Sequence, residues 1–260
     1  MARQKSSPAA ASVPFQGGYG RMSLSGEVTE GGPATWFAPC KMRYMLDGLV
    51  PPLLVVGGSL LLTACRQIYA RRQRTLGWPG DVAIVAVVIC LAAFLELKMG
   101  RNISYQHGPV RLWSGDINSD QNSQQIFDPY TLTHVIHGAV FYGLTRLALG
   151  SPPIAVCAIV AITLEAAWEV YENTDQVINR YRAATISLGY FGDSVINSFA
   201  DMLACLAGVL LAWRLPTIVT VTWVVAVEVI LAIWIRDNLT LNIIMLIHPV
   251  DVIRAWQMGT

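Results

Sequence analysis

Charged side chains are scarce in this sequence. Asp, Glu, Lys and Arg make up 13% of its 260 residues, and 54% are hydrophobic. Soluble domains carry about a quarter charged residues. The net charge of +1 gives no case for a nucleic-acid partner. Because the deficit of charge coincides with several apolar runs of spanning length, the sequence predicts an integral membrane protein embedded in a lipid bilayer.

The sequence also lacks the motifs that indicate a bound cofactor. No fingerprint for haem, flavin or nucleotide is present, and no internal repeat is evident. A cysteine in an apolar run behaves as a small hydrophobe. Neither a disulfide framework nor a thiolate metal site is predicted, because no CxxC pair occurs among the five scattered cysteines, Cys40, Cys65, Cys90, Cys157 and Cys205.

The apolar runs predict an all-α fold, a polytopic transmembrane helix bundle. Residues 1–45 are rich in Ser, Gly, Pro and Ala and predict a disordered tail, and Met42 or Met45 could even be the true start. Residues 46–260 are expected to form the membrane domain. Its last apolar run, 239–248, covers about half of the hydrocarbon thickness and predicts a re-entrant or interfacial helix. About six spans are expected, at 46–65, 81–97, 131–149, 154–172, 190–213 and 216–235.

Six polar residues lie at the ends of three neighbouring spans. Because successive spans alternate in direction, the start of the third, the end of the fourth and the start of the fifth reach the same membrane face. Ionisable groups at membrane depth are costly and mark functional sites by default. The sequence therefore predicts one site built from His134, His137, Glu169, Glu172, Asp193 and Asn197.

Helical spacing arranges these residues and two deeper carboxylates, Glu165 and Asp201, in polar stripes. Inward-facing histidines and carboxylates are the ingredients of metal sites in helix bundles. Such a set suits zinc, manganese or iron, and spacing does not choose among these divalent metal ions. The proposed ligands are His134, His137, Glu169 and Asp193. The candidate catalytic residues are the same four together with Glu172 and Asp201.

Four residues are candidates for substrate binding. Arg180 and Arg182 flank a tyrosine in the loop 173–190, and arginine suits bidentate capture of a phosphate or carboxylate. Asn197 is part of the expected site, and Asn173 is its polar neighbour. A purely structural interpretation stays open, in which the carboxylates pair with the two arginines and hold helices together. Glu228, inside the sixth span, is either a further carboxylate of the site or a lone interhelical contact.

The sidedness of the membrane is predicted from the densest basic cluster. Four arginines lie between residues 66 and 74, directly before the second span. Positive charges in short loops are retained in the cytoplasm, whereas long loops contribute little to orientation. The site is therefore expected at the opposite, periplasmic face of an inner membrane.

Three blocks of residues resemble a known family. The first block runs from Asn122 to Gly138, the second from Trp168 to Asp201, and the third from Arg236 to Gln257. They are similar to a family of uncharacterised multi-pass inner-membrane proteins, found mainly in alphaproteobacteria and described as a domain of unknown function. The resemblance covers about residues 81–257 and implies a fold and a location rather than an activity. The family usually has a histidine where this chain has Gln125, which would weaken a metal site if that position were a ligand.

Three functions remain open at this stage. The first is a membrane enzyme acting on a lipid-linked or phosphate-bearing substrate, with Arg180 and Arg182 on an anionic head group. The second is ion or solute transport along Glu165, Asp201 and Glu228. The third is a non-catalytic scaffold for another membrane assembly. The clustering of polar groups at one end of the spans argues against transport.

Overall fold

The computed structural model describes residues 49–53, 55–60, 63 and 77–259. The predicted tail, residues 1–45, and the basic cluster, residues 66–74, lie outside them. Helices and connecting loops make up the described part, which contains no strand, so the all-α prediction is confirmed there. Eight helices carry labels: α2 (Gly77–Lys98), α3 (Thr131–Leu149), α4 (Ile154–Glu172), α5 (Asp175–Ala184), α6 (Val195–Arg214), α7 (Thr217–Ile235), α8 (Leu239–Ile247) and α9 (Asp251–Met258).

Four of these helices are long and apolar enough to cross a membrane: α2, α4, α6 and α7. The predicted number of about six spans is not confirmed. The predicted first span corresponds to a shorter apolar helix, Leu49–Leu60. The predicted third span, α3, has 19 residues but is not among the four, and it carries His134, His137 and Arg146 within an otherwise apolar sequence.

Two boundaries differ from the sequence prediction around the loop 173–190. That segment contains helix α5, whose ends are favoured by Asp175 in the first turn and Arg182 in the last, each opposite in sign to the helix dipole there. Helix α6 begins at Val195 instead of near residue 190. Its N-cap is Ser194, which accepts a hydrogen bond from the backbone N–H of Asn197 at 3.3 Å.

Helices α3 and α6 pack with their backbones in close approach. A Cβ atom on Gly138 of α3 would lie 1.9 Å from the carbonyl oxygen of Cys205, and one on Gly208 of α6 would lie 2.0 Å from that of Val135. Small residues allow such crossings between membrane helices. The crossing fixes the polar start of α3 against the polar start of α6.

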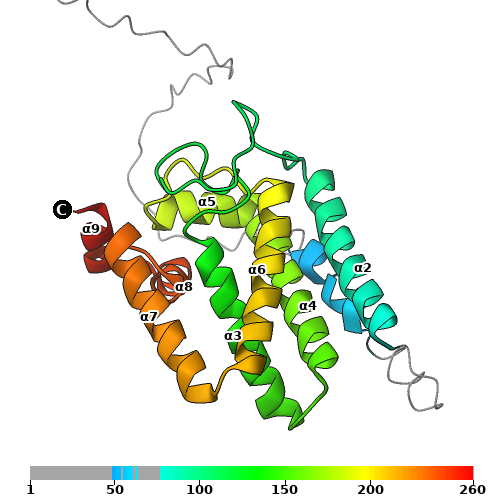
Figure 1. The fold of residues 1–260 in the computed structure, drawn as a ribbon. Helices are drawn as coiled ribbons and strands as arrows, with labels where there is room; N and C mark the ends of the chain where they lie inside the picture. The colour runs from blue at the N-terminus through cyan, green and yellow to red at the C-terminus, as the bar shows by residue number, and fades with distance from the viewer. Residues whose placement is uncertain (1–48, 54, 61–62, 64–76, 260) are drawn as a thin grey trace, which may run out of the picture. The chain divides into compact units, whose positions relative to one another are not determined.

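The start of α3, the end of α4 and the start of α6 lie at the same end of the bundle, below α5 and the loop 98–130 (Figure 1). The loop is fastened to the segment before α6: Gln124 Nε2 donates to the carbonyl of Gly192 at 2.7 Å, and the N–H of Val195 donates to that of Asn102 at 2.9 Å. Beyond the polar end, α3, α4 and α6 bury an apolar layer: Ala139, Tyr142, Cys157, Ala161, Cys205, Val209 and Ala212.

Helix α8 is held at both ends by side chains of opposite charge. Glu228 of α7 accepts hydrogen bonds from the backbone N–H groups of Leu239 and Thr240, each at 3.0 Å. Arg180 of α5 donates from Nε to the carbonyl of Leu246 at 2.9 Å. Both contacts complement the helix dipole. Of the two roles left open for Glu228, the structure matches the interhelical contact.

Candidate functional site

The centre of the polar end is His134, which is buried at the start of α3. Its Nδ1 atom contacts the carboxylate of Glu165 and lies 3.2 Å from Oε1 of Glu169. Its Nε2 atom lies 3.9 Å from Oδ2 of Asp201. His137, one turn along α3, places Nδ1 3.0 Å from Oε2 of Glu165. Three helices thus bring two imidazoles and three carboxylates together, and two of these carboxylates are the deep residues of the sequence analysis.

The cluster carries an excess of negative charge. Even with both imidazoles protonated, three ionised carboxylates would leave one uncompensated charge in a buried site. An unpaired buried charge is strongly unfavourable. Oε1 of Glu169 and Oδ1 of Asp201 are buried without a hydrogen-bond partner in the described part of the chain. A bound cation or extra protons would compensate the excess negative charge and would also give these two oxygens a partner.

Two overlapping groups within the cluster have ligand atoms within 4.8 Å of one another, which is close enough to share a metal ion. One contains His134, His137 and Glu165, and the other His134, Glu169 and Asp201. Histidine nitrogen and carboxylate oxygen are ligands of zinc and of other first-row metals. The predicted ligand Asp193 belongs to neither group.

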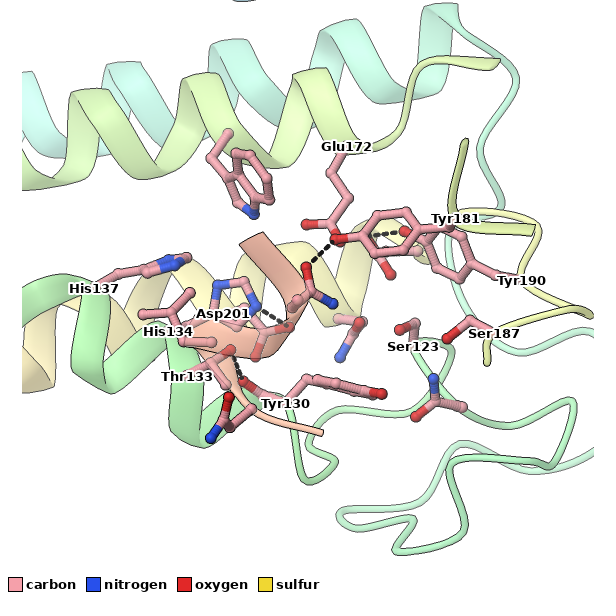
Figure 2. A pocket seen from close by; sticks show the side chains of 17 residues that line it. Ser123, Tyr130, Thr133, His134, His137, Glu172, Tyr181, Ser187, Tyr190 and Asp201 are labelled. Atoms are coloured by element: carbon pink, nitrogen blue, oxygen red, sulfur yellow. Dashed lines mark hydrogen bonds and ion pairs between the residues drawn. The ribbon is translucent and has the colours of Figure 1, made fainter. Parts of the chain in front are cut away.

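A polar cavity of about 50 Å³ adjoins the cluster. One water molecule needs roughly 10–15 Å³ of such space, so the cavity has room for an ion with a few waters. Figure 2 shows His134 and His137 on one side and Tyr190, Ser123 and Ser187 on the other. Among the described residues no Lys or Arg contributes to its lining, which comprises Asn122, Ser123, Tyr130, Thr133, His134, His137, Trp168, Glu172, Tyr181, Ser187, Tyr190, Asp193, Asn197, Asp201, Asn238, Leu239 and Asn242.

Asp193 lies in the extended segment before α6 and is held by three hydrogen bonds with two residues. Its Oδ2 accepts hydrogen bonds from the Tyr190 hydroxyl at 2.9 Å and from Nδ2 of Asn173 at 3.3 Å. Its backbone N–H donates to Oδ1 of Asn173 at 2.7 Å. Gly192 makes this turn possible: its φ is +96°, and a Cβ there would lie 2.8 Å from the same Oδ1 atom.

The electrostatics outside the spans favour protonated acids. Burial raises the pKa of Asp193 to about 6, although hydrogen bonds from Ser123 and Tyr190 oppose the shift. Burial and the neighbouring carboxylate of Asp193 also raise the pKa of Tyr190 well above its usual value. Asp193 can therefore exchange a proton near neutral pH, which is the range that general acid–base catalysis requires.

A second acidic group links the cavity to the C-terminal helices. The hydroxyl of Tyr130 donates to Oδ2 of Asp237 at 3.1 Å, and Nε2 of Gln257 in α9 donates to Oδ1 at 3.0 Å. Burial raises the pKa of Asp237 to about 6. The hydroxyl of Tyr181 donates to Oδ1 of Asn242 at 3.1 Å, so α8 contacts the cavity as well.

The structure separates the predicted substrate-binding residues into two groups. Asn197 lines the cavity, and Asn173 fixes Asp193 from behind it. The two arginines lie outside the cavity lining. Arg180 donates to carbonyls at the end of α8, and Nε of Arg182 donates to the carbonyl of Tyr190. Their role on an anionic head group stays a prediction.

Several residues of the site carried no role in the sequence analysis. Tyr130, Tyr181, Tyr190 and Ser187 line the cavity, but a tyrosine or serine outside an apolar run gives no signal without its spatial partners. Glu96, near the end of α2, is fully buried with both carboxylate oxygens unpartnered within the described residues. A carboxylate within an apolar span was a signal that could have found it. Gln125, where the family usually has histidine, bonds within the loop 98–130 and does not line the cavity.

In the part of the chain that the structure describes, the fold is all-helical, with four membrane-capable helices and a His/carboxylate cluster at one end of the bundle. Residues 96–259 match the model of a family described as a protein of unknown function, DUF2585. The chain belongs to this family. The resemblance drawn from the three sequence blocks is thereby confirmed.

The chain is similar to several curated alphaproteobacterial proteins. A UPF0314 protein of Sinorhizobium fredii is 50% identical over 188 residues, which cover 72% of this chain and 94% of the relative. One from Rhizobium meliloti is 46% identical, covering 66% and 87%, respectively. One from Sphingopyxis alaskensis is 44% identical, covering 70% and 95%. No solved structure matches the chain.

Proposed function

We propose that this protein is a metal-dependent membrane hydrolase that acts on a lipid-linked or phosphate-bearing substrate at the periplasmic face of the inner membrane. The proposed ligands are His134 and His137 with the carboxylates of Glu165, Glu169 and Asp201. The observation that carries the proposal is the convergence of these five side chains from three helices around His134. This ligand set differs from the one predicted from the sequence: it includes Glu165 and Asp201, and it omits Asp193.

The donor set fits a divalent cation, because the cation would neutralise the excess negative charge and bind the unpartnered oxygens of Glu169 and Asp201. Such an ion supplies Lewis acidity and lowers the pKa of a bound water molecule. Asp193, on the far side of the cavity, would take the proton from the attacking water and return it to the leaving oxygen. Tyr190 holds the carboxylate for that exchange through its hydrogen bond.

The lining of the cavity supports an oxygen-rich substrate group. Hydroxyl and amide groups from Ser, Thr, Tyr and Asn side chains surround the space next to the cluster. They can donate to phosphate or ester oxygens. Without Lys or Arg among the described lining residues, a cation at the cluster or protonated imidazoles would be needed to bind an anion beside Glu172 and Asp193.

Transport and scaffolding have weaker support. A polar path through Glu228 is not favoured, since this residue caps α8 and the apolar layer behind the cluster interrupts any route along α3, α4 and α6. A scaffold would need neither the unpartnered buried oxygens nor the proton-exchanging Asp193. It remains the alternative that the following experiment tests.

The first prediction concerns metal content and turnover. After dialysis against zinc or manganese, the purified protein should retain about one metal ion per chain. His134→Asn should abolish retention, whereas the matched variant of the exposed loop histidine, His107→Asn, should keep it. Metal content is measured by elemental mass spectrometry, and turnover as phosphate released from dihexanoyl phosphatidic acid.

Asp193→Asn separates metal binding from catalysis. It should retain the metal but reduce turnover by about 10²-fold or more, because it removes the proposed acid–base group. Metal retention without measurable turnover in the unmodified protein would favour the scaffold. If the unmodified protein retains no more metal than the background level, the metal-dependent mechanism is refuted.

A further inference from the structure

A second polar space lies at the same end of the bundle, outside the site described above. It is a cleft of about 510 Å³, within the range of roughly 300–1,000 Å³ for small-molecule sites. The loop 98–130, the end of α7 and helix α9 all contribute to it. Its lining residues are Gly115, Asp116, Ile117, Asn118, Ile186, Trp234, Ile235, Arg236, Gln257 and Met258.

Arg236 supplies the positive charge of this cleft. It follows the last residue of α7 in the left-handed region, with φ +55°, a conformation that costs free energy for most side chains. Its side chain is exposed, and Nη1 donates to the carbonyl of Trp256 at 3.3 Å. A guanidinium has five N–H donors, so this contact leaves capacity for the oxygens of a phosphate.

The lining also contains two side chains with hydrogen-bond acceptors, Asp116 and Gln257. The amide oxygen Oε1 of Gln257 is buried without a partner in the described residues, while Nε2 of that side chain is engaged by Asp237. Asp116 is exposed, and its Oδ1 accepts the backbone N–H of Asn118 at 3.0 Å. An unsatisfied acceptor and a carboxylate in the lining of one cleft fit a ligand with N–H donors, and a primary ammonium group has three.

Two tryptophans mark the depth of the cleft. The rings of Trp113 and Trp234 stack with centroids 6.2 Å apart, and both side chains are about half exposed. Trp234 lies in the last turn of α7, one of the four membrane-capable helices. Tryptophan is enriched where a span meets the lipid head groups. The cleft is therefore at the level of phospholipid head groups when α7 crosses a bilayer.

A third hollow, of about 380 Å³, shares lining residues with both the cleft and the site cavity. This hollow shares Ile117, Asn118 and Ile186 with the cleft. With the cavity beside His134 it shares another three residues: Asn122, Ser187 and Tyr190. Shared lining residues make the three spaces neighbours in a row, from the end of α7 to the cluster.

We propose that this cleft binds the head group of a phospholipid that carries both a phosphate and a primary amine, with Arg236 on the phosphate and Asp116 with Gln257 on the ammonium group. Its use as an access route to the cavity rests on the proposed function; the binding itself does not. Free phosphate shares the chemistry recognised by Arg236, so the test separates the two sources.

The experiment measures equilibrium binding to the full chain purified in a maltoside detergent with EDTA. The probe is dihexanoyl phosphatidylethanolamine, and the comparison probes are dihexanoyl phosphatidylglycerol, dihexanoylglycerol and inorganic phosphate. The ethanolamine lipid should bind saturably and more tightly than each of the others. Arg236→Asn should weaken its binding about tenfold or more, because a charge-assisted contact is lost. Asparagine tolerates the left-handed backbone at this position.

Two further variants provide the control and the head-group test. Arg214→Asn removes an exposed arginine at the far end of α6, which contacts Trp213 and lies outside the cleft, and should leave binding unchanged. Asp116→Asn can keep the turn with Asn118 and should abolish the preference for ethanolamine over glycerol. Equal binding in the Arg236 and Arg214 variants, or inorganic phosphate binding as tightly as the lipid, would overturn the proposal. EDTA makes this outcome independent of the metal proposal.

Discussion

Asp193 shows how a single side chain can be both well held and poorly solvated. Tyr190 and Asn173 donate to its carboxylate, yet burial outweighs them and raises its pKa to about 6 from an ordinary value near 3.8. The cause is the cost of removing an ionised carboxylate from water. Because burial outweighs these hydrogen bonds, Asp193 is suited to proton exchange, and its ionised form destabilises the fold.

The pH dependence of stability follows from that shift. Between about pH 4 and 6 the folded chain binds more protons at Asp193 than the unfolded chain, so the free energy of unfolding falls as pH rises through this window. The full loss is on the order of 2–3 kcal/mol. Thermal unfolding in detergent from pH 4 to 7 should show this decline, and Asp193→Asn should reduce it, leaving the part contributed by Asp237, whose pKa is also raised to about 6.

Asp251→Asn is the matched control for the pH experiment. Asp251 is an exposed carboxylate in the first turn of α9, and its replacement should leave the decline intact. A pH profile of Asp193→Asn that coincides with that of the unmodified protein would show that Asp193 does not ionise within this window.

The crossing of α3 and α6 sets the geometry of the site at the level of whole helices. Gly138→Ala places a methyl group 1.9 Å from the carbonyl oxygen of Cys205, and backbone cannot yield as a flexible side chain does. The variant should be destabilised by about 3 kcal/mol or more, and its metal retention should fall, because the helices must separate. The stability of the fold in detergent and the metal content can be measured on the same sample.

Gly143→Ala tests the reason for that effect. Gly143 lies in the same helix, but a Cβ there has no heavy atom within 4 Å. The change should be neutral or stabilise the helix by about 0.5–1 kcal/mol, since alanine favours helices over glycine. Equal damage from both alanine variants would indicate a general intolerance of α3 rather than the crossing with α6.

Helices that coincide with long apolar runs are predicted from the sequence. Helices that depend on tertiary contacts for their stability are not. The bounds of α3 and α4 coincide with the predicted segments, because polar turns surround long apolar runs. Helix α5 was missed because ten residues form a marginal helix alone, and α5 is stabilised by burying Val177, Ile178 and Tyr181 in the fold. Periodicity in a short polar segment gives little warning of such burial.

The grouping of residues around His134 could be predicted from the sequence, whereas the surroundings of Asp193 could not. Alternation of spans brings the starts of α3 and α6 to the end of α4, and the depth of Glu165 and Asp201 demands partners there, which the structure places around His134. The partners of Asp193 come from loops and from Asn173, whose positions depend on the turn at Gly192. Span alternation carries no information about such turns.

At the scale of the whole molecule, the position of the site across the membrane is the property on which the proposed function depends. The loop 98–130 and α5 lie at one end of the bundle, and the turn between α3 and α4 lies at the other (Figure 1). Residues of that loop and of α5 line the cavity, so the cavity belongs to the same end. With the basic residues 66–74 in the cytoplasm, as the sequence predicts, our proposal has the turn between α3 and α4 in the cytoplasm and the cavity in the periplasm. Cysteine labelling distinguishes these two faces.

In a chain with its native cysteines replaced, we predict that Gln106→Cys in the loop reacts with a membrane-impermeant maleimide in intact cells. Ser151→Cys, in the turn before α4, should react only after permeabilisation. Both native side chains are exposed, so accessibility within the fold does not separate them. The reverse pattern would place the cavity in the cytoplasm, where the substrate would have to come from the inner leaflet. Labelling of both positions in intact cells would show that the chain does not keep one orientation across the membrane.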